Sequence, residues 1–401
     1  MMHTLALAHR CLSRTAPSLY RANASPVTTA ATTSTSIAIL PRHSHRHYSC
    51  KISHPTKLAQ LRAKLRTFGQ GHIELDLNHS PGLALLTLSN PGKHNALTGK
   101  MMAELADCVD FLEEATNATS PSAASVTSMA LGSAESDSTQ LPQLHPESGL
   151  VLKSAGKPVA KLDQEHAEIL KGLVGIIVTG ADQKSYCAGL DLAAAKTTLL
   201  TPQAGAEMSA LMVSNLTRFM RLPILTIAAI EKAAIGGGAE MTTFCDHRCL
   251  ADNAKVQFVQ TQMGVVTGWG GASRLLNIVS RSQALRLLAS AEPIQGGQEA
   301  IDSGFAQATA PKGHAVEAAT EYMQQYVWEK RPSTHGDESQ GARRCVDAVR
   351  AMKRIVSFGL DYEGIERVSE LEKDLFKQLW GGPDNLARVE AASSKRKKSQ
   401  P

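Results

Sequence analysis

The sequence predicts an α/β protein, and three observations support this fold class. Apolar residues make up 43% of the 401 positions, which is enough to bury a sizeable core. Continuous apolar runs at residues 173–179 and 224–230 have the length of buried strands. Segments with helical spacing alternate with the strands and continue from about residue 313 to 386. No run reaches the roughly 18 apolar residues of a membrane-spanning helix, so we expect no membrane partner.

The first part of the core predicts a strand pair followed by a helix. Residues 73–78 and 83–89 have strand composition and are separated by turn residues at 80–82 (SPG). A helix is predicted to begin at the cap residue Thr98 and to run to residue 114. Residues 116–160, by contrast, are rich in Ser, Ala, Thr, Gly and Pro, which favours a loop insertion.

The composition also divides the chain into regions. Residues 1–68 hold ten Lys and Arg and no Asp or Glu, which is typical of a mitochondrial transit peptide. A disordered basic tail is the alternative, and the cytosol is then the alternative location. The remaining regions are a core at 69–312 that includes the insertion, a helical region at 313–390 and a basic tail at 391–401.

Charge and cysteine content argue against several classes of protein. The net charge of +5 comes from the two ends, and the acidic body between them disfavours a nucleic-acid partner. The seven cysteines show no paired spacing and no CxxC motif, which favours free thiols and argues against a metal site. Neither GxGxxG nor GxxxxGK[ST] is present, so no dinucleotide or triphosphate cofactor is indicated.

A glycine-rich turn at residues 234–240 (AIGGGAE) follows the second buried strand and begins a helix. Because the first amides of a helix lack internal partners and carry the positive end of its dipole, this turn suits a developing negative oxygen. A packing turn between strand and helix is the alternative interpretation. A second loop at residues 185–192 (SYCAGLDL) follows the first buried strand, so two strand-to-loop turns present free amides.

Together the two loops resemble the crotonase (enoyl-CoA hydratase/isomerase) superfamily. In that family an [S/A]GxD loop and a GGGxE helix start supply two backbone N–H groups to a thioester carbonyl. The resemblance covers about residues 70–390 apart from the insertion. It implies a crotonase (ClpP/crotonase-like) fold, a spiral of β-β-α units with a C-terminal helical region, assembled as a homo-trimer or hexamer.

The resemblance also implies the site residues. The amides of Ala188 and Gly237 would be the two donors, while Glu240 and Gln262 would take the places of the two hydratase acids. Residues 90–97 (NPGKHNAL) look like the family signature at the coenzyme A cleft. The residues expected to bind the substrate are Lys93, Asn95, Ala96, Gly189, Asp191, Gly236 and Trp269.

Several segments are similar to those of the ethylmalonyl-CoA decarboxylases within this superfamily, rather than to those of the hydratases: residues 217–223, 263–266, 268–271 and 379–386. Hydration needs water between two carboxylates, and the amide of Gln262 cannot exchange a proton. Loss of CO2 needs only a stabilised enolate, a positioned carboxylate and a proton for the α carbon. We expect Glu240 either to donate that proton or to position the departing group, with a role as a first-turn helix residue as the alternative.

The resemblance therefore predicts decarboxylation of ethylmalonyl-CoA to butyryl-CoA, and of methylmalonyl-CoA to propionyl-CoA, as removal of side products. No separate cofactor is expected, because coenzyme A is part of the substrate. An enoyl-CoA hydratase or isomerase is the alternative, and Gln262 and Trp269 disfavour it. An RNA-binding crotonase-fold protein is a further alternative, which only the basic ends favour.

Overall fold

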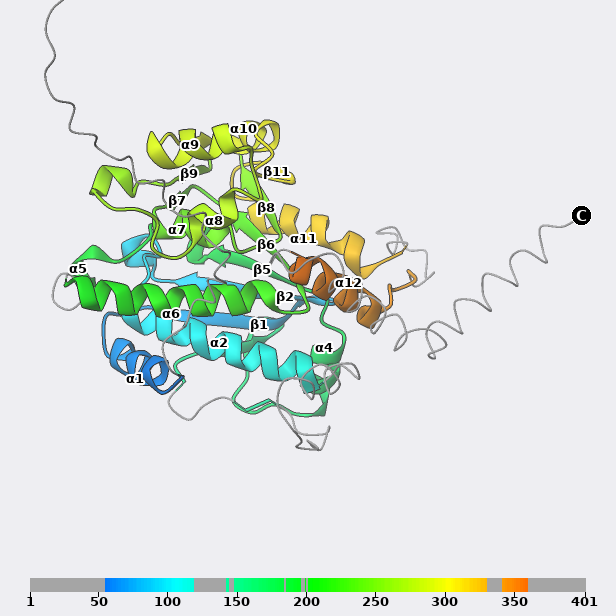
Figure 1. Cartoon of the computed structure of the whole chain (residues 1–401). Helices are drawn as coiled ribbons and strands as arrows, with labels where there is room; N and C mark the ends of the chain where they lie inside the picture. Colours follow the sequence, from blue (N-terminus) through cyan, green and yellow to red (C-terminus); the bar gives the residue numbers. More distant parts are fainter. Residues whose placement is uncertain are drawn as a thin grey trace, which may run out of the picture. The chain divides into compact units, whose positions relative to one another are not determined.

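The computed structural model describes residues 55–118, 142–143, 148–183, 185–195, 199, 201–329 and 341–359 (Figure 1). They form an α/β fold, as predicted. The predicted C-terminal tail and most of the predicted leader lie outside the described residues. None of the described helices has the length and apolar character needed to span a membrane.

The main sheet has eight strands in the order β11-β8-β6-β5-β2-β1-β3-β4. Strands β2, β5, β6, β8 and β11 run parallel to one another, while β1 pairs antiparallel with β2. Every residue of β5 is buried, and so is nearly every residue of β6, as expected of central parallel strands. The strands are β1 His72–Ser80, β2 Leu83–Ser89, β3 Val151–Ser154, β4 Lys157–Pro158, β5 Gly175–Gly180, β6 Leu225–Ile230, β8 His247–Ala251 and β11 Ala308–Ala310.

A second sheet of three short strands carries one side of the site. Its order is β10-β9-β7, and β7 runs parallel to β9. The bounds are β7 Ala233–Ile235, β9 Lys255–Gln257 and β10 Ile294–Gln295. Because β7 follows β6 after only two residues, the chain leaves the main sheet and begins the glycine-rich turn within a few residues.

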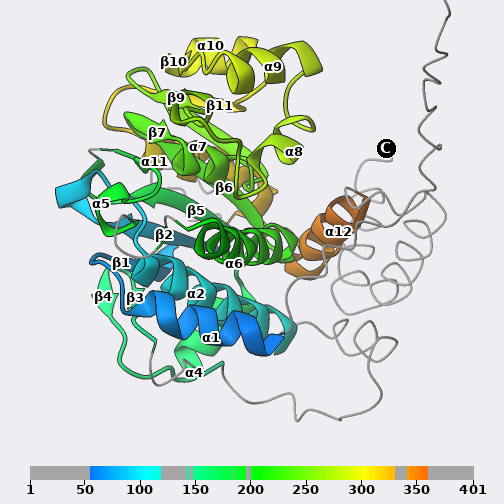
Figure 2. The ribbon, with the colours of Figure 1, turned by 60° about the vertical axis from the view of Figure 1, so that its left-hand side comes forward.

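Helices cover the sheets, and α1, α2 and α6 pack on one another beside β1 (Figure 2). Helix α11 packs on β5, β6 and β8. The helices are α1 Pro55–Arg66, α2 Gly99–Ala118, α4 Gln164–Lys171, α5 Leu192–Ala195, α6 Pro202–Arg221, α7 Gly237–Thr242, α8 Gly271–Leu275, α9 Arg281–Ala289, α10 Gly296–Asp302, α11 Ala315–Val327 and α12 Val346–Gly359, with 3-10 turns η1 Pro91–Lys93, η2 Ala181–Gln183 and η3 Thr261–Met263.

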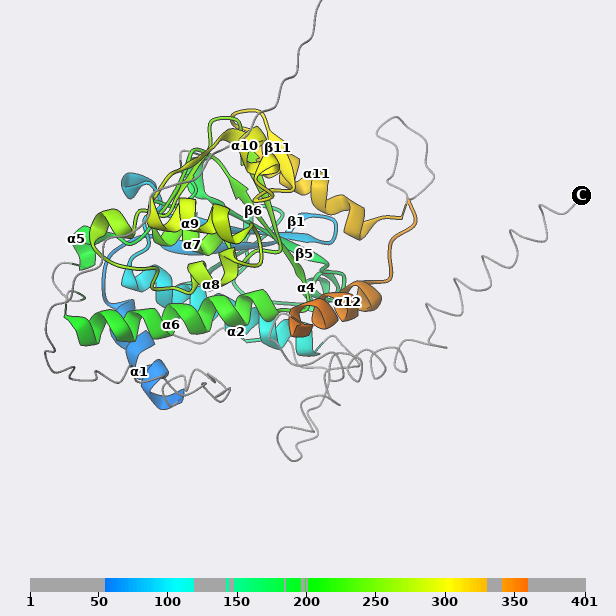
Figure 3. The same cartoon turned by 45° about the horizontal axis from the view of Figure 1, so that its top comes forward.

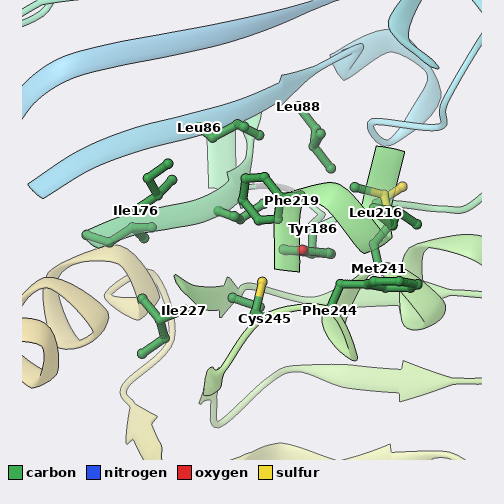
Figure 4. Packing of buried hydrophobic residues seen from close by; sticks show 14 of the residues in the cluster. Leu86, Leu88, Ile176, Tyr186, Leu216, Phe219, Ile227, Met241, Phe244 and Cys245 are labelled. Atoms are coloured by element: carbon green, nitrogen blue, oxygen red, sulfur yellow. The ribbon is translucent and has the colours of Figure 1, made fainter. Parts of the chain in front are cut away.

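One part of the hydrophobic core lies between the central strands and helices α6 and α7. Figure 4 shows Ile176 and Ile227 of the strands near Phe219, Tyr186 and Phe244. All five are at most 5% exposed. The core therefore fixes the ends of β5 and β6, from which both loops of the site begin.

The structure corrects two predicted boundaries. The predicted leader ended at residue 68, but α1 lies within it, and Leu61 and Leu65 of α1 are buried in the core. The predicted insertion at 116–160 contains regular structure toward both ends, because α2 runs to Ala118 and β3 pairs parallel with β1. Composition hid both elements, since α1 has no acidic residue and β3 lies in a polar, small-residue region.

Most other predicted elements are confirmed. The strand pair β1 and β2, the buried strands β5 and β6 and the helix α2 all lie where the patterns placed them. Thr98 caps α2, because its Oγ1 accepts a hydrogen bond from Met101 N at 3.3 Å. The helical region after residue 313 is confirmed for α11 and α12, and its continuation to 386 lies outside the described residues.

Helix α12 lies beside the C-terminal end of α6 and is held by buried polar contacts (Figure 3). Lys353, which is 4% exposed, pairs with Asp246 just before β8. The guanidinium of Arg350 donates to the carbonyls of Leu170 in α4 (2.8 Å) and of Leu173 just after α4 (2.9 Å). These contacts join the C-terminal helix to the edge of the core at which β5, β6 and β8 begin.

Candidate active site

The two predicted loops lie side by side, because main-chain hydrogen bonds join them. Cys187 pairs with Ala234 of β7 in a parallel bridge. The amide of Cys187 donates to Ala233 O at 3.0 Å, and the amide of Ile235 donates to Cys187 O at 2.9 Å. The loop after β5 is thus fixed against the turn that begins α7.

Glycine is required where the two loops come closest. Gly189 has φ +90°, and a Cβ at this position would lie 2.7 Å from Ile235 O and 3.2 Å from Gly237 N. A side chain at Gly238 would meet Cys187 O at 2.1 Å. These approaches bring the amides around residue 189 next to the N-terminus of α7.

The structure corrects the predicted donor in the first loop. The amide of Ala188 is already used, because it donates to His94 O at 3.0 Å. The amide of Asp191 donates to Leu97 O at 2.9 Å, and that of Gly189 reaches Cys187 Sγ at 3.4 Å. The Leu190 amide has no acceptor among the groups that the structure describes, so it is the donor that this loop offers.

The second predicted donor is the amide of Gly237, and the structure agrees that this amide is unpaired within the described residues. Gly237 is the first residue of α7, and its N–H has no acceptor within the described part of the chain. Gly236 precedes it as the N-cap, with φ 56° and ψ −117°, and its own amide donates to Gln257 O at 2.9 Å. Leu190 and Gly237 therefore present two unpaired N–H groups, one of them at the positive end of a helix.

Glu240 lies one turn along α7 and is 2% exposed. Its Oε2 accepts hydrogen bonds from the amides of Trp269 (2.8 Å) and Gly271 (2.9 Å). Its Oε1 accepts from Gln260 Nε2 (2.8 Å) and Gly268 N (3.2 Å). Burial raises the pKa of this carboxyl, and the four donors oppose that rise by stabilising the charged form.

The partner of Glu240 differs from the predicted one. Gln262 is exposed on η3, whereas Gln260, which is 9% exposed, contacts the carboxylate. Exactly twenty residues separate Glu240 from Gln260, so residue spacing alone could have suggested it. As found for Gln262, an amide cannot replace the second acid of a hydratase.

Trp269, which was predicted to shape the acyl pocket, packs beside the two donor loops. It is 3% exposed. A Cβ added to Gly237 would lie 2.3 Å from Cζ3 and 2.5 Å from Cη2 of the indole. The ring therefore lies directly against the residue whose amide is one of the two donors.

Asn95 was predicted to bind the substrate, but the fold uses its side chain instead. It is 1% exposed, and its Nδ2 donates to the carbonyls of Ser185 (2.7 Å) and Ala181 (3.1 Å). Its Oδ1 accepts from Asn90 N at 3.0 Å. Asn95 thus joins the loop around η1 to the loop after β5, so it acts on the site through the backbone.

The other predicted binding residues divide in a similar way. Asp191 caps α5, because its Oδ1 accepts hydrogen bonds from Ala193 N (3.0 Å) and Ala194 N (3.1 Å). The carboxylate that was predicted to bind the substrate is thus already engaged by the backbone. Ala96 is 6% exposed. Among the predicted binding residues, only Lys93, at the end of η1, has an exposed side chain. Lys93 remains placed for a solvent-facing part of a ligand.

The donor pair lies outside the large cavity that the structure describes. A cavity of about 990 Å³ lies between α12 and the beginnings of β6 and β8, and none of the donor residues lines it. Within the described ranges, no group of three or more His, Cys, Asp or Glu side chains is arranged to hold a metal ion. The site is thus a pair of backbone donors beside a buried carboxylate and an indole.

Two unpaired amides from adjacent loops, one of them at a helix N-terminus, are donors of the kind that an anionic oxygen requires. Comparison with protein families agrees with this class: residues 165–338 match the model described as enoyl-CoA hydratase/isomerase. The chain belongs to this crotonase family, whose members act on acyl-CoA thioesters.

Within the family, the chain is similar to proteins named ethylmalonyl-CoA decarboxylase. It is 30% identical to the Xenopus laevis protein over 346 residues, which is 85% of this chain and 91% of the relative. It is 31% identical to the Rattus norvegicus protein over 328 residues, covering 81% and 85%. The Homo sapiens protein is 30% identical over 340 residues, covering 84% and 86%.

Solved structures confirm the crotonase fold. An enoyl-CoA hydratase from Bacillus anthracis superposes with a TM-score of 0.57 at 20% identity, covering 80% of this chain and 96% of that chain. An enoyl-CoA hydratase from Polaromonas sp. JS666 gives the same TM-score and identity, covering 81% and 98%. At this identity the likeness concerns the fold.

Proposed function

We propose that this enzyme decarboxylates short α-carboxy acyl-CoA thioesters, with ethylmalonyl-CoA and methylmalonyl-CoA as substrates. The observation that carries the proposal is the pair of unpaired amides at Leu190 and Gly237. The similarity to proteins named ethylmalonyl-CoA decarboxylase over most of the chain supports the choice of substrate.

The proposed reaction needs only the substrate and one proton. The bond between the α carbon and its carboxylate breaks, CO2 leaves, and the electron pair moves into the thioester carbonyl. The enolate oxygen so formed accepts hydrogen bonds from the two amides, each worth about 3 kcal/mol in the transition state. The enolate then takes up a proton at the α carbon, which gives butyryl-CoA or propionyl-CoA.

Contacts around Glu240 favour decarboxylation over hydration of an enoyl thioester. Hydration by this fold requires a second acid to hold and deprotonate water. Here the side chain at hydrogen-bond distance from Glu240 is the amide of Gln260. We propose that Lys93, which is exposed in the same loop as Asn95, contacts the nucleotide end of coenzyme A.

Product masses test the proposal. The purified chain is incubated separately with ethylmalonyl-CoA, methylmalonyl-CoA and crotonyl-CoA. Butyryl-CoA and propionyl-CoA from the first two, with crotonyl-CoA unchanged, would support it. Hydration of crotonyl-CoA without any CO2 release would refute it and favour the hydratase alternative.

We further propose that the protein assembles as a homo-trimer or hexamer. Crotonase-type enzymes are typically oligomeric, and closed symmetric assemblies are the usual form of homo-oligomers. Light scattering coupled to size-exclusion chromatography measures the mass directly. A monomer at micromolar concentration would contradict this part of the proposal.

A mitochondrial location is also proposed, on the acid-free basic composition of residues 1–68. Because α1 begins at Pro55, the fusion to test carries residues 1–54 on a fluorescent protein. Import into mitochondria is expected, and a diffuse cytosolic signal would contradict it. The full chain lacking residues 1–54 is the matched control.

A further inference from the structure

The Glu240 carboxylate is fully occupied by hydrogen-bond donors. Four donors serve its two oxygens, and three of them are the backbone amides of Gly268, Trp269 and Gly271. A side-chain amide can turn its oxygen toward a carboxylic acid and accept a hydrogen bond, but a backbone N–H can only donate. Burial raises the pKa of this carboxyl, the four donors oppose that rise, and together they leave no lone pair directed at a substrate.

The donors belong to a short turn that wraps around the Glu240 side chain. A Cβ at Gly271 would lie 2.6 Å from Glu240 Cγ, so α8 begins in direct contact with the carboxylate arm. The side chain thus fixes the backbone on both sides of Trp269. The only side-chain donor, Gln260, has no described partner for its Oε1, so Glu240 is the group that orients it.

The indole held by this turn reaches the oxyanion donor. Trp269 is buried and lies against Gly237, as the 2.3 Å from a Gly237 Cβ to indole Cζ3 shows. A buried carboxylate on the first turn of α7 therefore sets the position of a ring that covers the beginning of the same helix. Displacement of the turn would move the indole away from Gly237.

We propose that Glu240 is a positioning residue that holds Trp269 against the Gly237 donor and does not transfer a proton. This inference rests on the proposed function and identifies how its acyl site is closed. The ring limits the space beside the thioester carbonyl and keeps water away from the enolate oxygen. The α carbon accordingly receives its proton from a group other than Glu240.

A double-mutant cycle tests the inference kinetically. Glu240→Gln and Trp269→Ala should each lower kcat for ethylmalonyl-CoA by about 10- to 100-fold, the usual range for groups that orient a site. Because both changes remove the same wall, Glu240→Gln should cost less than about threefold in the Trp269→Ala background. Full multiplication of the two losses would overturn the proposal.

The pH dependence of kcat provides the second criterion. If Glu240 only positions the indole, Glu240→Gln should lower kcat by a similar factor at every pH and keep the shape of the profile. Loss of one limb of a bell-shaped profile would identify Glu240 as an acid or base and overturn the proposal. Glu104→Gln, which removes another fully buried carboxylate away from the site, is the control for general destabilisation.

Tryptophan fluorescence tests the positioning without any substrate. In a Trp328→Phe and Trp380→Phe background, Trp269 is the remaining tryptophan. Glu240→Asp and Glu240→Gln should shift its emission to longer wavelength and increase quenching by acrylamide, while Glu104→Gln should do neither. Unchanged emission in both Glu240 variants would overturn the proposal. If the emission shifts but no thioester is decarboxylated by the wild type, the proposed function fails and the positioning role stands.

Discussion

Single residues decide whether the donor pair can form, and the most sensitive positions are those at which a side chain would be in the way. At Gly189 the backbones of the two loops lie too close together to leave room for a methyl group. At Gly237 the backbone lies equally close to the indole of Trp269. The two donor amides carry no side-chain chemistry of their own. Their ability to donate to a ligand depends on the glycines that leave space for them and on the nearby carboxylate of Glu240.

Gly237→Ala should lower kcat/KM by at least about 100-fold, because the new methyl group must displace the Trp269 ring and so disturbs one oxyanion donor. Steady-state kinetics on ethylmalonyl-CoA measures the loss. Gly205→Ala in α6 is the matched control, since its nearest neighbour would be Leu199 O at an ordinary 3.8 Å. Equal activity of the two variants would contradict the assigned donor.

Gln260→Ala should impair the enzyme far more than Gln262→Ala. The first change removes a hydrogen bond to a buried carboxylate, worth about 1.5–3 kcal/mol, whereas the second alters an exposed side chain. Chemical denaturation gives the stability change, and kcat/KM gives the functional one. A larger effect at Gln262 would support the prediction from the sequence that Gln262, and not Gln260, takes the place of the second hydratase acid.

The elements differ in how far the sequence determines them. Strands β5 and β6 and helix α2 were predicted because their apolar pattern is long and regular, whereas α1 was hidden by the composition of a leader. The donor at Leu190 could not be predicted, because it depends on a bridge between Leu97 and Leu190 that uses the neighbouring amides. Gly237 was predictable, since any residue at a helix start has an unpaired N–H.

Helix α1 is joined to α2 by charge as well as by apolar packing. Asp107 of α2 is buried and pairs with Arg62 and Arg66 of α1. Burial alone would raise the pKa of Asp107, but the hydrogen bonds from Arg66 and Arg62 outweigh it and lower the pKa. A carboxyl whose pKa is lowered by folding stabilises the protein above its unfolded pKa of about 4 and loses this contribution as the pH falls through its folded pKa.

Asp107→Asn should therefore destabilise the protein at pH 7 by about 3 kcal/mol, the lower end of the range for a broken buried pair, since both arginines are partly exposed. Urea unfolding from pH 7 to pH 3 measures the difference. The gap between wild type and variant should narrow below about pH 4. Asp302→Asn, on the exposed end of α10, is the control, and a gap that does not change with pH would disprove the charge contribution.

On the scale of the whole molecule, the polar contacts of α12 link a late part of the sequence to the edge at which the central strands begin. Asp246 binds both Lys353 and the amide of Thr226 near the beginning of β6, with the latter bond at 2.8 Å. The site loops lie at the opposite, carboxyl ends of β5 and β6. Loss of α12 should thus affect stability before it affects the donors.

Lys353→Met should loosen α12 and leave the site in place. Hydrogen–deuterium exchange is expected to rise in peptides from residues 346–359 and to stay unchanged in residues 234–242. Lys312→Met, at an exposed position before α11, is the control. Faster exchange at both segments would show that α12 and the donor turn form one cooperative unit.

The bridge between Cys187 and Ala234 has an evolutionary consequence. The two hydrogen bonds that set the separation of the donor loops run from main chain to main chain, so they need no particular chemical group at these two positions, only side chains small enough for a fully buried site. We therefore expect selection on the proposed donor geometry to act on the glycines and small buried residues of the two loops, and less on residues away from them. Such a scaffold can exchange the groups lining its acyl pocket, and so acquire new substrates, without first losing the chemistry that makes any of them reactive.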